Sequence, residues 1–165
     1  GGRVSGHADI ANLHTEQPYI NANIMAKNFT FSHGDMGNLS AQAHWDQENS
    51  QLRFLGDVWE DTLRTSLIDG TLDLANEELW LDIEADSLNA SFLNNMLSSF
   101  MSQITGHASG NITIGGPITE IDLMGALLTD MDFTLSPTNT KYHFRDSIRF
   151  TPGVMHFNNI DIYFM

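Results

Sequence analysis

The sequence predicts a mostly β protein, and three observations support this. Short runs in which apolar and polar residues alternate dominate the chain, and residues 79–84 are a clear example. Turn-forming residues separate the runs, which recur roughly every ten residues. No stretch of about 18 apolar residues occurs, so no membrane-spanning helix is expected. Strict alternation is typical of strands with one buried and one hydrated face, so we expect a meander, sandwich, barrel or open solenoid.

Each expected strand follows the same period of two. In residues 79–84, Leu79, Leu81 and Ile83 would face one side of a strand, whereas Asp82 and Glu84 would face the other. The other alternating runs are 71–74, 111–114, 121–123, 133–135, 142–145, 148–150 and 160–162. Turn chemistry is found at 76–78, 115–117, 136–137 and 151–153.

Residues 87–104 interrupt the strand pattern and predict one amphipathic helix. Asp86 or Ser87 would cap its start, and Gly106 would close its end. The segment contains no Lys or Arg, so we expect it to plug an open end or face of the sheet rather than bind a membrane surface. Apolar residues spaced three and four apart would form its buried stripe: Leu88, Phe92, Leu93, Met96, Leu97, Phe100, Met101 and Ile104.

An internal repeat accompanies these elements. The four residues from Ser5 to Ala8 return as Thr105 to Ala108, and residues 29–32 resemble residues 133–136. We therefore expect residues 1–165 to form a single β-rich unit with two imperfect repeats, at about 5–32 and 105–136. Because the last expected strand runs to the final residue, we also expect the chain to be a section of a larger protein.

Composition argues against several classes of function. The chain has no Cys, so disulfides, thiolate metal sites and cysteine nucleophiles are excluded. Its 21 Asp and Glu residues outnumber 7 Lys and Arg, giving a formal net charge of −14. Such a charge repels nucleic-acid phosphates, so we expect no nucleic-acid partner.

Motifs for catalysis or metal binding are also missing from the sequence. The seven histidines show no HxH or HxxxH spacing, so no metal site is expected. Carboxylate pairs such as Asp130 and Asp132 could be proposed as catalytic, but most acidic residues alternate with apolar ones and are expected on hydrated strand faces. We therefore predict that the protein is not an enzyme and has no cofactor.

One stretch in the last third carries a recognisable order of residues. Residues 110–117 read Gly-Asn-Ile-Thr-Ile-Gly-Gly-Pro, and residues 121–125 read Ile-Asp-Leu-Met-Gly. This order resembles the glycine–strand–glycine and proline–strand–glycine signature of the TamB family, which is related to the AsmA-like envelope proteins. Residues 128–153 look like the version carried by Bacteroides-type bacteria. Met124 departs from the pattern, because a polar residue is commoner there.

The resemblance implies a fold, a location and a function. The fold would be an elongated, curved, meandering antiparallel sheet that is open and U-shaped with an apolar interior. The chain would be the periplasmic portion of a protein that is anchored in the inner membrane by a segment absent from this sequence. It would take part in phospholipid transport between inner and outer membranes, in outer-membrane protein assembly and secretion, or in both. The implied partners are an outer-membrane barrel protein of the TamA or assembly-machinery type and phospholipid acyl chains.

We expect alternating residues of several strands to point to one side and to form a hydrophobic groove or core. A secreted or periplasmic β-sandwich binding module remains the alternative and would show surface aromatic residues and a closed core. A carboxylate-dependent hydrolase would instead need two carboxylates facing each other in one cleft. The candidate groove residues are Leu79, Leu81, Ile83, Ile112, Ile114, Phe133, Leu135, Tyr142, Phe144, Ile148 and Phe150.

Overall fold

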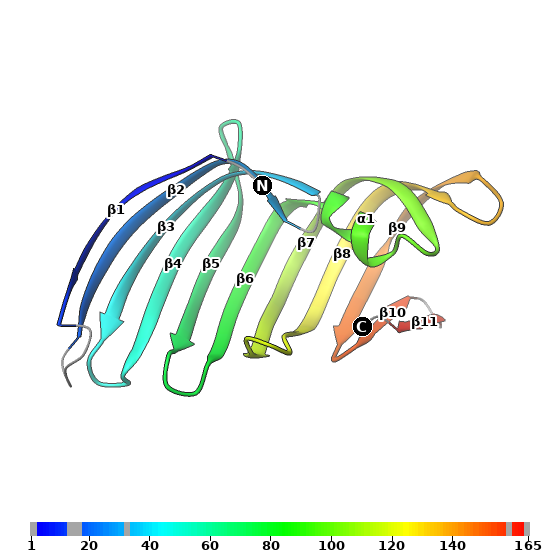
Figure 1. Ribbon diagram of the computed structural model, residues 1–165. Helices are drawn as coiled ribbons and strands as arrows, with labels where there is room; N and C mark the ends of the chain where they lie inside the picture. The colour runs from blue at the N-terminus through cyan, green and yellow to red at the C-terminus, as the bar shows by residue number, and fades with distance from the viewer. Residues whose placement is uncertain (1–2, 13–17, 32–33, 158–159, 164–165) are drawn as a thin grey trace.

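The protein forms one long, curved antiparallel sheet (Figure 1). The computed structural model describes residues 3–12, 18–31, 34–157 and 160–163. Each strand pairs with its neighbour in the chain, so the sheet order runs from β1 to β11 without a crossover. The sheet is not closed, because β1 and β11 lie at opposite edges. The prediction of a mostly β, meandering antiparallel fold is confirmed.

The regular elements among the described residues are eleven strands and one short helical segment. In chain order they are β1 (Arg3–Ala11), β2 (Tyr19–Phe31), β3 (Gly34–Asp46), β4 (Gln51–Glu60), β5 (Leu63–Asp73), β6 (Glu78–Asn89), the 3-10 helix η1 (Ala90–Phe92), α1 (Leu93–Met96), β7 (Met101–Pro117), β8 (Asp122–Leu135), β9 (Thr140–Thr151), β10 (Val154–Phe157) and β11 (Ile160–Tyr163).

Two of the hairpin turns use the same local chemistry. Asp46 ends β3, and its Oδ1 accepts hydrogen bonds from the backbone N–H groups of Glu48 and Asn49. Asp73 ends β5, and its Oδ1 accepts in the same way from Ala75 and Asn76. A carboxylate that accepts backbone hydrogen bonds two and three residues ahead stabilises a tight reversal of the chain. The sequence pattern Asp-x-x-Asn thus ends one strand and starts the next.

The predicted helix over residues 87–104 is wrong. Residues 87–89 complete β6 and residues 101–104 begin β7, which leaves only η1 and α1 as helical structure among the described residues. The cap is Asn89 rather than Asp86 or Ser87, because Asn89 Oδ1 accepts from the N–H of Ser91 at 3.0 Å. Gly106 does not end the helix; it lies inside β7 with a φ of 115°.

Local propensity and tertiary pairing together explain the short helix. The segment is rich in Ser and Asn, whose side chains compete with helical hydrogen bonds. Pairing of Met101 with Leu135 on β8 also supplies the backbone hydrogen bonds that a longer helix would have made. An irregularity between Ser102 and Thr105, where Gln103 has a φ of 55°, brings both Met101 and Ile104 into the core. A helical spacing of apolar residues can therefore arise from a strand with a bulge.

The two predicted repeats lie in strands that occupy different parts of the sheet. Residues 5–8 belong to β1 and residues 105–108 belong to β7. Gly6 lies opposite Ile24 on β2, whereas Gly106 lies opposite Met131 on β8. Ser32, the last residue of the first copy, is outside the described residues.

Candidate functional site

One face of the sheet is mostly apolar along the paired strands whose side chains are described, with Ser66, Thr129 and Asp146 as polar members. Residues directly opposite each other in an antiparallel pair project to the same face. Leu81 is opposite Ile114, and Ile83 is opposite Ile112, so β6 and β7 present their aliphatic residues together. The same holds from strand to strand, because the registers mostly match apolar positions with apolar or glycine positions.

The members of this apolar face can be traced across the sheet. They include Val4, Gly6, Ala8 and Ile10 of β1, Ala22, Ile24 and Ala26 of β2, Leu39, Ala41, Ala43 and Trp45 of β3, Leu52, Phe54, Gly56 and Val58 of β4, Ile68, Gly70 and Leu72 of β5, Leu79, Leu81 and Ile83 of β6, Ile112 and Ile114 of β7, Leu123, Leu127, Met131, Phe133 and Leu135 of β8, Tyr142, Phe144, Ile148 and Phe150 of β9, and Met155 and Phe157 of β10.

Part of the apolar face is covered. The helical segment η1–α1 packs against it near β7 and β3, and Leu93 and Leu97 are fully buried there. Figure 1 shows α1 lying across one end of the neighbouring long strands. Beneath this cover, Leu127 and Met131 on β8 are also fully buried. This end of the sheet is therefore a closed core.

Asn94 fastens this cover to the sheet. Its side-chain oxygen accepts a hydrogen bond from the N–H of Ile104 at 2.8 Å, and its amide nitrogen donates to the carbonyl oxygen of Ile104 at 3.0 Å. The same amide nitrogen also donates to the carbonyl of Ser91 at 3.0 Å. The Asn94 side chain thus joins η1–α1 to the first residues of β7. It also satisfies the N–H and the carbonyl of Ile104, for which the bulge in β7 leaves no partner on the neighbouring strand.

The opposite end of the apolar face is open. Val4 and Ile10 on β1 are 69% and 55% exposed, and Ile24 on β2 is 37% exposed. Leu79 and Leu81, farther along the sheet, are half-buried. Exposed apolar residues that adjoin one another on a single face form a patch able to take an apolar guest.

The eleven predicted groove residues all lie on this face, but their environments differ. Ile112, Ile148 and Phe150 are buried in the closed core. Tyr142 is 48% exposed, and its ring stacks on Phe133 with centroids 5.8 Å apart. The others, Leu79, Leu81, Ile83, Ile114, Phe133, Leu135 and Phe144, are half-buried.

The sequence interpretation missed the two central core residues of β8, Leu127 and Met131. It placed strands only at 121–123 and 133–135, whereas β8 runs continuously between them. The available signal was an unbroken period of two in which Leu123, Gly125, Leu127, Thr129 and Met131 share one face.

The other face of the sheet is polar, and a hollow lies near its middle. The hollow has a volume of about 660 Å³ and spans β3 to β7. Leu55 and Leu67 line it together with carboxylates. Two of these carboxylates have cationic neighbours: Asp69 is 3.1 Å from Arg53, and Asp57 is 3.9 Å from Arg64.

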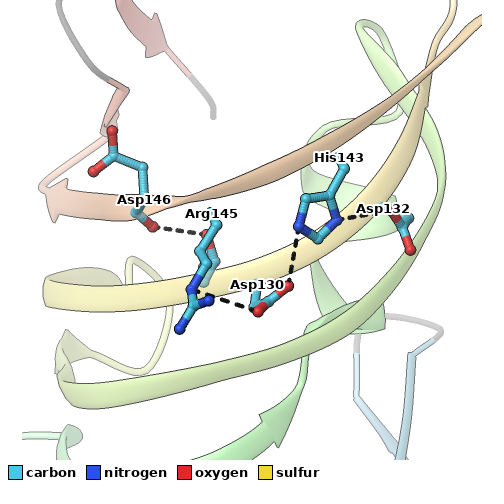
Figure 2. A network of polar contacts seen from close by, with 6 residues as sticks. Asp130, Asp132, His143, Arg145 and Asp146 are labelled. Atoms are coloured by element: carbon cyan, nitrogen blue, oxygen red, sulfur yellow. Dashed lines mark hydrogen bonds and ion pairs between the residues drawn. The ribbon is translucent and has the colours of Figure 1, made fainter.

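A chain of ion pairs lies on the same polar face at β8 and β9 (Figure 2). His143 contacts Asp132 at 3.0 Å through Nδ1 and Asp130 at 3.4 Å through Nε2. Arg145 Nε lies 3.6 Å from the second oxygen of Asp130. All four side chains are more than half exposed, so water screens these contacts and they add little to stability. Asp130 and Asp132 thus lie on a hydrated strand face, where the sequence predicts most acidic residues to lie.

The described residues contain no group of three or more His, Asp or Glu side chains placed to hold a metal ion. In the same part of the chain, no helix is long and apolar enough to cross a membrane. No protein-family model, no curated protein and no solved structure matches this chain. The resemblance to the TamB family therefore remains a prediction from the sequence. The apolar face of the sheet is the structural feature from which a function can be proposed.

Proposed function

We propose that this chain is a section of an envelope scaffold that carries phospholipid acyl chains along the apolar face of its sheet. The scaffold would span the periplasm and serve lipid transport between the inner and outer membranes, outer-membrane protein assembly and secretion, or both. The supporting observation is that the apolar face runs through consecutive strands and is exposed at Val4 and Ile10 of β1 and at Ile24 of β2. The location and the barrel-protein partner rest on the sequence resemblance alone.

A continuous apolar surface can hold an acyl chain along its length. Removing a methylene group from water gains about 0.8 kcal/mol, so an acyl chain is held by any uninterrupted apolar surface. Movement along the surface needs neither a nucleophile nor a metal, because no bond is broken. Directly opposite neighbours link Ile24 on β2 to Ile83 on β6 through Ala41, Gly56 and Ile68.

The alternative of a β-sandwich binding module has less support. A sandwich buries one sheet against a second, whereas the described strands all belong to one sheet. Its apolar face is covered by a short helical segment at one end only. Exposed aromatic residues do occur, including Trp80 and Tyr142, but they belong to opposite faces.

Photo-cross-linking tests the proposal. The purified chain is incubated with vesicles of phospholipid that carries a photoreactive group at the end of one acyl chain, and cross-linked peptides are identified by mass spectrometry. We expect cross-links on the apolar side of β1 to β6. Ile24→Asp should remove most of the cross-linking, because a carboxylate on the open face stays hydrated and repels an acyl chain.

A matched control is available one residue away. Asn23 is on the same strand but projects to the polar face, opposite His7. Asn23→Asp introduces the same charge and should leave cross-linking unchanged. Equal losses in the two variants, or cross-links confined to the polar face, would contradict the proposal.

A further inference from the structure

The hollow on the polar face lies over the middle strands of the sheet, from β3 to β7. Its volume of about 660 Å³ is in the range of ligand-binding clefts. Strand register distributes its polar groups in an orderly way. The outer strands β3 and β7 contribute the side-chain amides of Gln42 and Asn111, and the strands between them contribute four carboxylates, Asp57, Asp69, Asp82 and Glu84.

Two of the three tryptophans flank this hollow at opposite ends. Trp80 comes two residues before Asp82 on β6, and Trp59 comes two residues after Asp57 on β4. Positions two apart in a strand share a face and are separated by about 7 Å, so both indole side chains adjoin the hollow. Trp80 is 45% exposed and Trp59 is 37% exposed. The hollow therefore has an exposed aromatic side chain next to each end.

Trp80 is placed for stacking. Its indole ring lies close over Gly115, the directly opposite residue on β7, where any larger residue would push the ring away. A ring that lies over the sheet and stays partly exposed offers an apolar surface to a ligand that enters from the solvent. The CH groups of a sugar ring form a surface of the matching kind.

The polar groups of the hollow include both hydrogen-bond acceptors and donors. Ionised carboxylates only accept hydrogen bonds, whereas the amides of Gln42 and Asn111 donate as well as accept. A sugar hydroxyl also donates and accepts, so it can use both kinds of group. A cation would use only the acceptors.

The chain's own donors already hold two of the carboxylates. Arg53 lies 3.1 Å from Asp69, and the Thr113 hydroxyl donates to Asp82 at 2.7 Å. A carboxylate has about four lone-pair sites, so each remains able to accept hydrogen bonds from a ligand. The guanidinium of Arg53 also offsets part of the negative charge, which weakens attraction for a free cation.

We propose that this hollow binds a neutral oligosaccharide. Its sugar rings stack on Trp59 and Trp80, and its hydroxyl groups hydrogen-bond to the carboxylates and amides between them. The site is on the face opposite to the one that would carry acyl chains. The proposal thus goes beyond the lipid-carrying function and does not depend on it.

The distance between the two indoles favours several linked sugars over a single one. Arg53, Thr71 and Trp80 are consecutive directly opposite neighbours on β4, β5 and β6. Trp59 is six residues beyond Arg53, which corresponds to about 20 Å along the strand direction. The two strands are also about 10 Å apart across the sheet. Only an extended ligand can contact both rings.

NMR titration with neutral hexasaccharides tests the proposal. The isotope-labelled chain is titrated separately with maltohexaose, cellohexaose and chitohexaose. At least one of them should bind and should shift the indole N–H signals of Trp59 and Trp80. The signal of Trp45 should not shift, because that side chain belongs to the apolar face.

Variants then identify the contacts. Trp80→Ala and Trp59→Ala should each weaken binding about tenfold, because a stacking surface is lost. Glu84→Gln should weaken it about threefold, since hydrogen bonds to a charged acceptor are stronger than those to a neutral one. Glu84 is exposed, so this variant keeps the test decisive if a tryptophan variant does not fold. Tyr19→Ala is the matched control, because Tyr19 is a 51% exposed aromatic residue on β2 that does not line the hollow.

Ionic strength separates a neutral ligand from a cationic one. Raising the salt concentration from about 50 mM to about 500 mM should change the hexasaccharide affinity by less than about twofold, because no charge on the ligand is screened. Spermine, a cationic probe, should not displace the bound hexasaccharide. Failure of all three hexasaccharides to bind, a shift of Trp45 alone, displacement by spermine, loss of binding in salt, or equal weakening by Tyr19→Ala would each overturn the proposal.

Discussion

The indole ring of Trp80 on β6 lies over Gly115, its directly opposite neighbour on β7. A methyl group at position 115 would clash with the ring, because the ideal Cβ position there falls on the indole carbons. Glycine at 115 is thus required by a close side-chain approach and not by a left-handed backbone conformation.

Because of this contact, the effect of Gly115→Ala on stability should change sign when Trp80 is replaced by alanine. Gly115→Ala should destabilise the wild-type protein by about 1 kcal/mol, because the indole ring of Trp80 has to shift to avoid the added methyl group. In a Trp80→Ala background the same change should stabilise by about 0.5–1 kcal/mol, since alanine restricts the unfolded chain more than glycine does. Urea denaturation of the wild type, Gly115→Ala, Trp80→Ala and the double variant measures both effects. A destabilisation of equal size in both backgrounds would refute the role assigned to Trp80.

Asn94 should be needed to hold η1–α1 on the sheet. Asn94→Ala leaves the N–H and carbonyl of Ile104 without the amide partner, so we expect a loss of about 1–3 kcal/mol in the free energy of unfolding. Protection of the Ile104 amide against hydrogen exchange should fall in the same variant. Asn23→Ala, on the exposed side of β2, is the control and should change stability by less than about 0.5 kcal/mol.

Two leucines test which parts of the sheet form a closed core. Leu97, which directly follows α1, is fully buried, whereas Leu128 on β8 is 55% exposed on the polar face. Leu97→Ala should cost about 2–5 kcal/mol because it opens a cavity. Leu128→Ala should change the free energy of unfolding by less than about 0.5 kcal/mol. Similar costs for both would mean that η1–α1 does not pack as described.

The turn carboxylates predict how stability responds to acid. Hydrogen bonds from the backbone N–H and the side chain of Asn76 lower the pKa of Asp73 below its ordinary value of 3.8. Because the folded pKa is the lower one, the stabilisation is complete above pH 3.8 and is lost as the pH falls through the folded pKa. Asn76→Ala should raise the pKa of Asp73 toward 3.8, measured by NMR titration of its carboxyl carbon.

A second turn provides an internal comparison. The side chain and backbone N–H of Asn49 lower the pKa of Asp46 in the same way. Asn49→Ala should therefore raise the pKa of Asp46 and leave that of Asp73 unchanged. A shift of both carboxyls in either variant would show that the two turns do not act independently.

For β6, the sequence by itself determined the alternating part of the strand and the face to which each of its side chains points. Alternation at Leu79, Leu81 and Ile83 is enough to assign a face, because side-chain direction in a strand depends only on the period of two. The turns after Asp46 and Asp73 are equally local, since their hydrogen bonds span only two or three residues. These properties need no knowledge of the rest of the chain.

Only the tertiary structure decided where that apolar face is closed and where it is open. Ile112 and Ile114 are two residues apart on one strand, yet the first is buried and the second only half-buried, because burial depends on what packs above them. The spacing from Leu88 to Ile104 resembled a helix until the pairing of Met101 with Leu135 drew its end into β7. Strand pairing joins residues far apart in the chain, so its outcome cannot be derived from local spacing alone.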